Sequence, residues 1–308
     1  MAQAVPVRVR RSAPYLARKH AAKSLTIRPV IGGHALIESS DAASPPLLST
    51  DNSLIFSDGI WVDANTDTGL DYSDGESQER ELRRILSDAP DRRWDAAGLA
   101  RNHNDWALEY HLSPVRANIL RGLALKNRKT VLEVGAGCGA ITRYLGDQGF
   151  RVDAVEGSTA RAQLAALRCQ GLDDVSLVRA NINDLTLPAA TYDLVLFVGV
   201  LEYAARFWGD DSSAETAVKK MLSQAVASLT PGGVILVAIE NRIGAKYLCG
   251  FSEDHFGRPW AGVAGYPMFL GGDVGIRTFD SKQWVNMLES MALKHRFFYP
   301  LPHYKLPQ

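Results

Sequence analysis

The sequence predicts an α/β protein whose core is a doubly wound, mostly parallel sheet with helices on both faces. Two observations lead to this prediction. From about residue 130 onward, short runs of aliphatic and β-branched residues alternate with helical segments, the pattern of a sheet joined by right-handed crossovers. Several runs, such as Leu194–Val198, are also apolar on both faces, as strands covered by helices on each side must be.

The elements follow from periodicity and from their boundary residues. Thr130–Val134 is the expected first strand, and a glycine turn separates it from a helix over 141–148. Ser113 and Pro114 mark the start of a helix that precedes this strand. Further helices are expected over 76–87 and, as one or two helices, over 94–109. The remaining elements are strands at 151–155, 176–179, 194–198, 234–239 and 294–299, and helices at 159–170, 214–229 and 281–291.

The N-terminal part differs in charge from the rest of the chain. Residues 1–30 hold seven Lys or Arg and no acid, whereas residues 31–79 hold ten Asp or Glu and no Lys or Arg. We therefore expect a basic tail over 1–24 and a small β-rich module over 25–75, ahead of the main domain over 76–308. A tail that touches anionic lipid or a partner, or that acts as a transit peptide, ranks lower because the basic run lacks a clear amphipathic period.

Composition narrows the class of protein. The chain has 308 residues, 46% of them hydrophobic and 22% charged, with zero net charge. Its overall charge therefore gives no reason to expect a nucleic-acid partner. No apolar run is long enough to span a bilayer, and no secretory signal is recognisable. Cys138, Cys169 and Cys249 are too scattered for a disulfide frame or a zinc site. We expect a cytoplasmic protein, with the inner face of the membrane as the open alternative.

The turn after the first strand is the most informative motif. Gly135 and Gly137 place bare backbone at the mouth of a helix, which suits a small polar cofactor. Glu156, 21 residues after Gly135, is spaced to bind a ribose diol. Both features suit NAD and S-adenosyl-L-methionine (SAM) alike. Glu133 favours SAM, because a carboxylate there attracts a sulfonium and an amino group but repels a pyrophosphate.

These residues carry a family resemblance. Glu133–Gly139 resembles the first motif of class I SAM-dependent methyltransferases, which have a Rossmann-like fold, and four further pieces occur in the order of that family, namely 155–156, 179–184, 192–203 and 229–233. The resemblance implies a transferase that uses SAM and releases S-adenosylhomocysteine. It also implies the cofactor-binding residues Glu133, Gly135, Ala136, Gly137, Gly139, Glu156, Gly157, Asn181, Ile182, Gly199 and Val200.

An alcohol acceptor must lose a proton, so a base is expected near the methyl group. His255 is the first candidate and Glu240 the second, with a backbone-holding role as the structural alternative for the histidine. Four further residues are candidates for substrate contact, although surface ion pairing or packing explains them equally well. They are Tyr110, His111, Arg242 and Arg258. No His, Asp or Glu set has the spacing of a metal site, so no metal is predicted.

A narrower resemblance concerns the acceptor. Residues 238–247, 253–259 and 299–307 are similar to methyltransferase modules of bacterial surface-polysaccharide (O-antigen type) biosynthesis, which share chains with other modules. It implies an acceptor that is a sugar hydroxyl or a terminal phosphate on a lipid-linked glycan. Because the last strand of the fold is missing after 294–299, we also expect a longer native chain. An NAD-dependent oxidoreductase and a non-catalytic, partner-binding module remain the alternatives.

Overall fold

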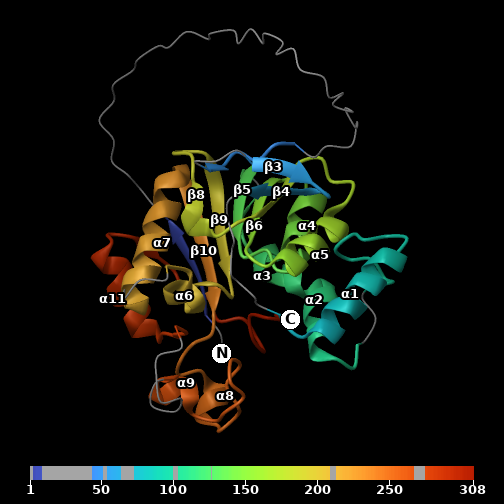
Figure 1. Ribbon diagram of the computed structural model, residues 1–308. Helices are drawn as coiled ribbons and strands as arrows, with labels where there is room; N and C mark the ends of the chain where they lie inside the picture. The colour runs from blue at the N-terminus through green and yellow to red at the C-terminus, as the bar shows by residue number, and fades with distance from the viewer. Residues whose placement is uncertain are drawn as a thin grey trace, which may run out of the picture.

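A computed structural model describes residues 3–8, 44–50, 54–63, 73–99, 103–125, 127–208, 213–266 and 275–308 (Figure 1). Its centre is a nine-stranded sheet in the order β11-β1-β10-β9-β5-β6-β7-β4-β3. The predicted doubly wound α/β fold is therefore confirmed. The parallel core of this sheet consists of β5 (Thr130–Val134), β6 (Arg151–Glu156), β7 (Val175–Arg179), β9 (Tyr192–Val198) and β10 (Leu229–Ile239).

Alternation along the central strands explains the two helical layers. In β9, Val195 and Phe197 enter one apolar core, whereas Leu194 and Leu196 enter the core on the opposite face. A strand that is apolar on both sides needs helices on both sides. The first face is covered by α6 (Ala204–Trp208), α7 (Ala214–Ser228) and α11 (Ser281–Ser290), and the second by η1 (Pro114–Ala117), α3 (Asn118–Arg121), α4 (Ala140–Asp147) and α5 (Thr159–Cys169) (Figure 1).

Two further helices form an outer layer against α5. These are α1 (Glu76–Asp88) and α2 (Trp106–Leu112), and Leu82 and Leu86 of α1 are buried in a cluster with Leu164 of α5. The sequence predicted helix over 94–109, but residues 94–99 form turns. The Asp105 side chain explains where α2 begins, because it accepts hydrogen bonds from two backbone N–H groups of the first turn.

The edge strands differ from expectation. β1 (Gln3–Arg8), which we had placed in a basic tail, pairs antiparallel with β10 and with β11 (Lys294–His295). It lies between β10 and β11 in the sheet. β11 is shorter than the strand predicted over 294–299. The prolines that follow, Pro300 and Pro302, have no N–H group to donate to a sheet. The rest of the predicted tail lies outside the described residues.

Within the region expected to be β-rich, β3 (Leu54–Ser57) and β4 (Ile60–Asp63) form an antiparallel hairpin. It extends the main sheet, since β4 pairs in parallel with β7. The same region contacts the rest of the fold a second time through β2 (Ser49–Thr50), which pairs antiparallel with β8 (Leu185–Thr186). The strand expected over 25–37 lies outside the described residues, and a separate module over 25–75 stays a prediction.

The chain ends beside the carboxyl edge of the sheet. Arg116 donates a hydrogen bond to the Lys305 carbonyl (2.8 Å), and Asn118 donates one to the Pro307 carbonyl (2.8 Å). These bonds hold the terminal segment against η1 and α3. Between β10 and α11, the short helices α8 (Ala245–Leu248) and α9 (Ala261–Ala264) project from the sheet at the bottom of Figure 1. Among the described helices, none combines the length and apolar character required to cross a bilayer.

Candidate active site

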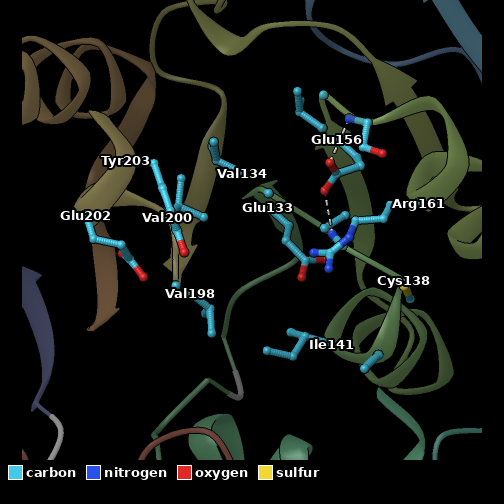
Figure 2. Close-up of a pocket in the computed structure, with 18 of the residues that line it drawn as sticks. Glu133, Val134, Cys138, Ile141, Glu156, Arg161, Val198, Val200, Glu202 and Tyr203 are labelled. Atoms are coloured by element: carbon cyan, nitrogen blue, oxygen red, sulfur yellow. Dashed lines mark hydrogen bonds between the residues drawn. The ribbon is translucent and has the colours of Figure 1, made fainter. Parts of the chain in front are cut away.

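A cavity of about 700 Å³ opens at the carboxyl ends of β5, β6, β7, β9 and β10. Ligands of doubly wound sheets bind at this edge. Figure 2 shows the arrangement of its lining, with Glu133 in the middle, Glu156 and Arg161 on one side, and Val200 and Glu202 on the other. We refer to these two sides as the cofactor end and the acceptor end.

The glycine turn between β5 and α4 forms the floor of the cofactor end. Gly135 and Gly137 have φ values of 76° and 55°, in the region that favours glycine. A Cβ on Gly135 would lie 2.4 Å from the Val200 side chain, so the turn and the β9 loop can meet only through glycine. A Cβ on Gly137 would meet no atom within 4 Å. Gly137 therefore leaves open space above the floor, as a bound ligand requires.

Gly139 has a different role from the predicted one. The residue does not line the cavity. Its φ is 76°, and a Cβ there would lie 2.9 Å from the Ala165 backbone of α5. Gly139 thus allows α4 and α5 to approach closely, which is a packing role and not a cofactor contact.

Glu156 organises the backbone around the turn. Its two carboxylate oxygens accept hydrogen bonds from Gly137 N–H (2.7 Å) and Ser158 N–H (2.8 Å), and both are drawn as dashed lines in Figure 2. The side chain is buried and lines the cavity, together with Gly157. Because each oxygen has two lone pairs, the carboxylate can still accept hydrogen bonds from a ligand.

Glu133 lies between the two ends of the cavity. Its carboxylate accepts a hydrogen bond from the Thr142 hydroxyl (2.7 Å) and is only 3% exposed. Burial raises the pKa of Glu133 to about 8, although the Thr142 bond and the Arg116 charge oppose this shift. The group is thus mostly protonated at neutral pH, and a cationic ligand beside it would favour the ionised form.

Arg116 is a cation that the sequence analysis missed. It is buried, lines the cavity, and lies over the Tyr110 ring at 4.2 Å from the ring centroid. One guanidinium nitrogen, Nε, has no hydrogen-bond partner among the described residues. When a cationic ligand ionises Glu133, Arg116 and Glu133 place opposite charges near the same part of the cavity, which is the pattern that a zwitterionic amino-acid group requires.

A charged wall closes the cofactor end on the side of the outer helices. Asp74, just before α1, accepts hydrogen bonds from Arg161 (2.5 Å) and pairs with His111 Nε2 (2.8 Å). Burial lowers the pKa of His111, while the His111 and Arg161 contacts outweigh burial and lower the pKa of Asp74. Tyr110 and His111 do line the cavity as predicted. Neither Asp74 nor Arg161 belonged to a motif, so the sequence carried no signal for them.

Two more of the residues predicted to bind the cofactor line the far side of the cofactor end. Asn181 and Ile182 both contribute to the lining. The Asn181 side chain accepts a hydrogen bond from Asn183 N–H (3.1 Å) and donates one to the Phe207 carbonyl (3.1 Å). These bonds position η2 (Ile182–Asp184) beside α6 at the cavity wall.

Three ionisable side chains from separate elements meet at the acceptor end. They are Glu202 of η3 (Leu201–Tyr203), Glu240 just after β10, and His255 in the loop after α8, and we call them the acceptor cluster. Their ligand-type atoms all lie within 4.8 Å of one another. The sequence predicted His255 and Glu240 as catalytic candidates but gave no sign that Glu202 completes a cluster. The prediction of no metal site thus failed to anticipate this group, because its members are distant in sequence.

Hydrogen bonds orient the histidine of the acceptor cluster. His255 Nδ1 lies 3.2 Å from Glu253 Oε2 and 3.1 Å from the Tyr266 hydroxyl. With Nδ1–H directed at a carboxylate, Nε2 carries the lone pair and faces Glu240 Oε2 at 4.0 Å. Burial alone lowers the pKa of His255, but Glu253, Glu240 and Glu202 outweigh it, and the pKa lies above its usual value.

The two glutamates are buried side by side. Each is 3% exposed. Burial first, and Glu240 second, raise the pKa of Glu202 to about 8. Lys305 Nζ lies 2.8 Å from Glu240 Oε1 and 3.6 Å from Asp254, so the terminal segment supplies a cation to this end of the cavity. The segment 299–307 carries a family resemblance, but nothing in its sequence predicted a role for Lys305.

The floor of the acceptor end is the turn after β9. Gly199 (φ 70°) and Val200 line the cavity as predicted. A Cβ on Gly199 would lie 3.3 Å from the Tyr304 hydroxyl and 3.7 Å from Glu202 Oε1. The turn, the buried tyrosine and the acceptor cluster are therefore immediate neighbours.

Two predicted substrate residues do not reach the cavity. Arg242 donates two hydrogen bonds to the Val263 carbonyl (3.1 and 2.8 Å), and so fixes the short helix α9 to the end of β10. Arg258 is exposed and does not line the cavity. Neighbouring residues of the same loops, Glu240 and His255, line the cavity, but the two guanidinium groups lie outside it.

Comparisons with known proteins agree with this geometry. Residues 132–237 match a family model described as "Methyltransferase domain". The chain is 25% identical over 155 residues to the ubiquinone biosynthesis O-methyltransferase of Rickettsia prowazekii, covering 50% of this chain and 55% of that protein. It is 31% identical over 107 residues to the demethylmenaquinone methyltransferase of Tropheryma whipplei, covering 35% and 40%. The chain therefore spans about half the length of the curated relatives it matches.

Solved structures give more distant similarities. The putative methyltransferase in complex with the Haloferax volcanii Trm112 activator is 17% identical, with a TM-score of 0.40 and coverage of 57% of this chain and 65% of that one. Phosphoethanolamine N-methyltransferase 2 of Haemonchus contortus, in complex with SAM, is 18% identical, with a TM-score of 0.41 and coverage of 57% and 35%. The family match, the strand order and the glycine turn agree: residues 132–237 are similar to a methyltransferase domain, and the cavity beside the turn suits SAM as the cofactor.

Proposed function

We propose that this chain is an O-methyltransferase that acts on a hydroxyl of a sugar in a lipid-linked glycan or another cell-envelope intermediate. The assignment of a glycan as the acceptor rests on a resemblance to polysaccharide-assembly modules, which residues 238–247, 253–259 and 299–307 carry. The choice of a hydroxyl over a terminal phosphate rests on the base at the acceptor end. A hydroxyl must lose a proton as it attacks, whereas a phosphate oxygen is already ionised, and His255 lies at this end beside Glu240.

The cofactor end has the groups that SAM requires. Glu133 and Arg116 are placed for the amino and carboxylate groups of the methionine part, and Glu156 for the ribose hydroxyls. Gly137 leaves the space in which the ligand would lie, and Asn181 and Ile182 are placed for the adenine. Bound SAM supplies a methyl group on a sulfonium, to which the acceptor oxygen bonds while the electron pair of the broken carbon–sulfur bond stays on sulfur.

The acceptor cluster provides the remaining chemistry. As the oxygen attacks, its proton passes to His255 Nε2, which lies in the cavity with its lone pair exposed to the acceptor. Glu253 holds the ring through Nδ1 and stabilises the charge that the ring gains. The single observation that carries this proposal is the position of this oriented histidine, beside Glu240 and next to the Gly199–Val200 floor.

The test is methyl transfer from radiolabelled SAM to matched synthetic acceptors. One acceptor ends in a sugar hydroxyl and the other carries a phosphate on the same sugar. We expect label in the hydroxyl acceptor and little in the phosphate. Preferential labelling of the phosphate would contradict the choice of acceptor. If SAM binds but neither compound nor a wider panel of envelope glycans is labelled, the non-catalytic module becomes the better explanation.

The lipid-linked character of the acceptor has separate support on the surface. In the projecting segment, Leu248, Phe251 and Trp260 are 55%, 65% and 43% exposed. Ser252 and Pro259 form an antiparallel bridge, so Phe251 and Trp260 are neighbours across it. Exposed aromatic and aliphatic side chains beside a binding site suit an acyl or polyprenyl environment. We propose that the protein works at the inner face of the membrane, and expect F251S to reduce co-sedimentation with vesicles that contain anionic lipid.

A further inference from the structure

We propose that the acceptor cluster binds a divalent transition-metal ion, of the Mn²⁺ or Zn²⁺ type, through Glu202, Glu240 and His255. Binding of the ion depends only on these side chains. Its role in holding the acceptor oxygen rests on the proposed function.

The first argument is the spacing of the three side chains. Glu240 Oε2 and His255 Nε2 are 4.0 Å apart, too far for a hydrogen bond. An ion bound by carboxylate and imidazole lies about 2.0–2.2 Å from each ligand atom, which puts neighbouring ligand atoms about 3.0–3.5 Å apart. Small side-chain rotations would close the observed gap around an ion. Glu202 offers a third ligand atom, and all three atoms lie within 4.8 Å of one another.

The second argument is the orientation of the imidazole. Glu253 Oε2 accepts from the His255 backbone N–H (3.0 Å) and lies 3.2 Å from Nδ1. The neighbouring Tyr266 hydroxyl adds a contact at 3.1 Å. Metal-bound histidines are generally held this way, with the outer nitrogen on a carboxylate and the inner nitrogen free to ligate. A histidine that only packs in a core would not need its inner nitrogen directed at two buried acids.

The third argument is the lack of partners for the acids. Glu202 and Glu240 are each 97% buried, being 3% exposed. The Oε2 atom of each carboxylate has no hydrogen-bond partner among the described residues. Burying a polar atom without a partner is unfavourable, and ligand-type atoms of both acids lie within 4.8 Å of each other, which indicates that a ligand belongs between them.

Lys305 does not occupy this space. Its Nζ pairs with the other oxygen of Glu240, Oε1, at 2.8 Å, and lies 3.6 Å from Asp254. The two oxygens of Glu240 therefore face different partners. Lys305 holds one side of the carboxylate in place, and the cation site lies on the other side.

The ligand types determine which ions fit. Two carboxylates and one imidazole suit Mn²⁺, Fe²⁺, Co²⁺ or Zn²⁺ better than Ca²⁺ or Mg²⁺, which prefer oxygen ligands alone. Three protein ligands also leave positions open for an acceptor oxygen and water. In this state His255 Nε2 is a ligand and not the proton acceptor. The ion lowers the pKa of the bound hydroxyl, and its proton passes to water.

The experiment measures ion binding and not only activity. Metal-free protein is titrated with MnCl₂, followed by the electron paramagnetic resonance signal of free Mn²⁺, and with ZnCl₂ by calorimetry. We expect one ion per chain, and a weakening of at least tenfold in E202Q, E240Q and H255A. E289Q is the matched control, because Glu289 is an exposed carboxylate of α11 that does not line the cavity. The control should keep the affinity, whereas an equal loss in E289Q would attribute the effect to the net charge of the protein.

Two further readouts separate this inference from the proposed function. The ion should raise the melting temperature of the parent protein but not of E202Q or E240Q, and SAM affinity should be the same in all variants. If no ion binds at millimolar concentration while hydroxyl methylation proceeds, the cation site is refuted and His255 remains the base. If the ion binds but no hydroxyl acceptor is methylated, the cation site stands and the proposed acceptor fails.

Discussion

The pH dependence of SAM binding should report the ionisation of Glu133. Burial raises the pKa of this carboxyl to about 8, so only about a tenth of it is ionised at pH 7, and forming the carboxylate there costs about 1.4 kcal/mol. If the carboxylate binds the amino group of SAM, the dissociation constant should fall roughly eightfold from pH 6 to pH 7. It should level off near pH 8, where an α-amino group of pKa about 7.7–8.0 loses its own proton.

Calorimetric titration of SAM across this pH range is the assay, with two variants of opposite purpose. In E133Q the eightfold change should disappear, because the amide does not titrate. T142V removes a hydrogen bond that lowers the Glu133 pKa, so the rise in affinity should shift to higher pH. A parent protein whose affinity is constant between pH 6 and 7, or an E133Q variant that keeps the full dependence, would refute the role of this carboxylate.

The same pKa shift predicts an opposite trend in stability. The folded-state pKa of Glu133 lies above the ordinary value of 4.5, so between about pH 4.5 and 8 the folded, ligand-free protein holds a proton that the unfolded chain has lost. The free energy of unfolding should then decrease with rising pH, by up to about 1.4 kcal/mol per unit from this group. Urea unfolding of the parent and E133Q should show the slope reduced by that amount in the variant, and equal slopes would contradict it.

Three other predictions concern the turn, the ribose site and the base. G135A should lower the melting temperature by several degrees, because its Cβ would lie 2.4 Å from Val200 at a φ of 76°; an unchanged melting temperature would show that the loop yields freely. E156Q should weaken SAM binding about tenfold and also lower the melting temperature, because the amide NH2 cannot accept from one of the two backbone N–H groups that Glu156 binds; unchanged calorimetric affinity would remove Glu156 from the cofactor site. H255A should lower kcat by about 10²–10⁴-fold at constant SAM affinity, and a loss that appears only in KM would contradict its action on the acceptor.

Much of the central fold is predictable because its signals are local. The turn from Gly135 to Gly139 lies between a buried strand and a helix, and the observed bounds of β5 and α4 agree with the expected ones to within a residue. Strands apolar on both faces predict helical layers without any knowledge of the partners. The cofactor residues are predictable for the same reason. Glu133, Glu156 and Gly199 all lie at strand ends in one sheet, and those ends meet at the cavity.

The features that sequence did not predict depend on long-range contacts. β1 pairs with β10 more than 200 positions later, and nothing in Gln3–Arg8 indicates that partner. Asp74 and Arg161 meet across the outer helices, and Lys305 reaches Glu240 from the terminal segment. Gly139 shows the converse difficulty, because its place in a motif suggested a ligand contact while its geometry serves helix packing.

The central claim is that this cavity holds SAM through two buried acids at the ends of β5 and β6. The most direct test is calorimetric titration of S-adenosylhomocysteine and of NADH into the parent protein and into the E133A/E156A double variant. The account predicts one site for S-adenosylhomocysteine on the parent protein, no detectable heat with NADH, and a loss of at least a hundredfold in affinity in a double variant that still folds. Binding of NADH alone, or unchanged affinity in that variant, would contradict it.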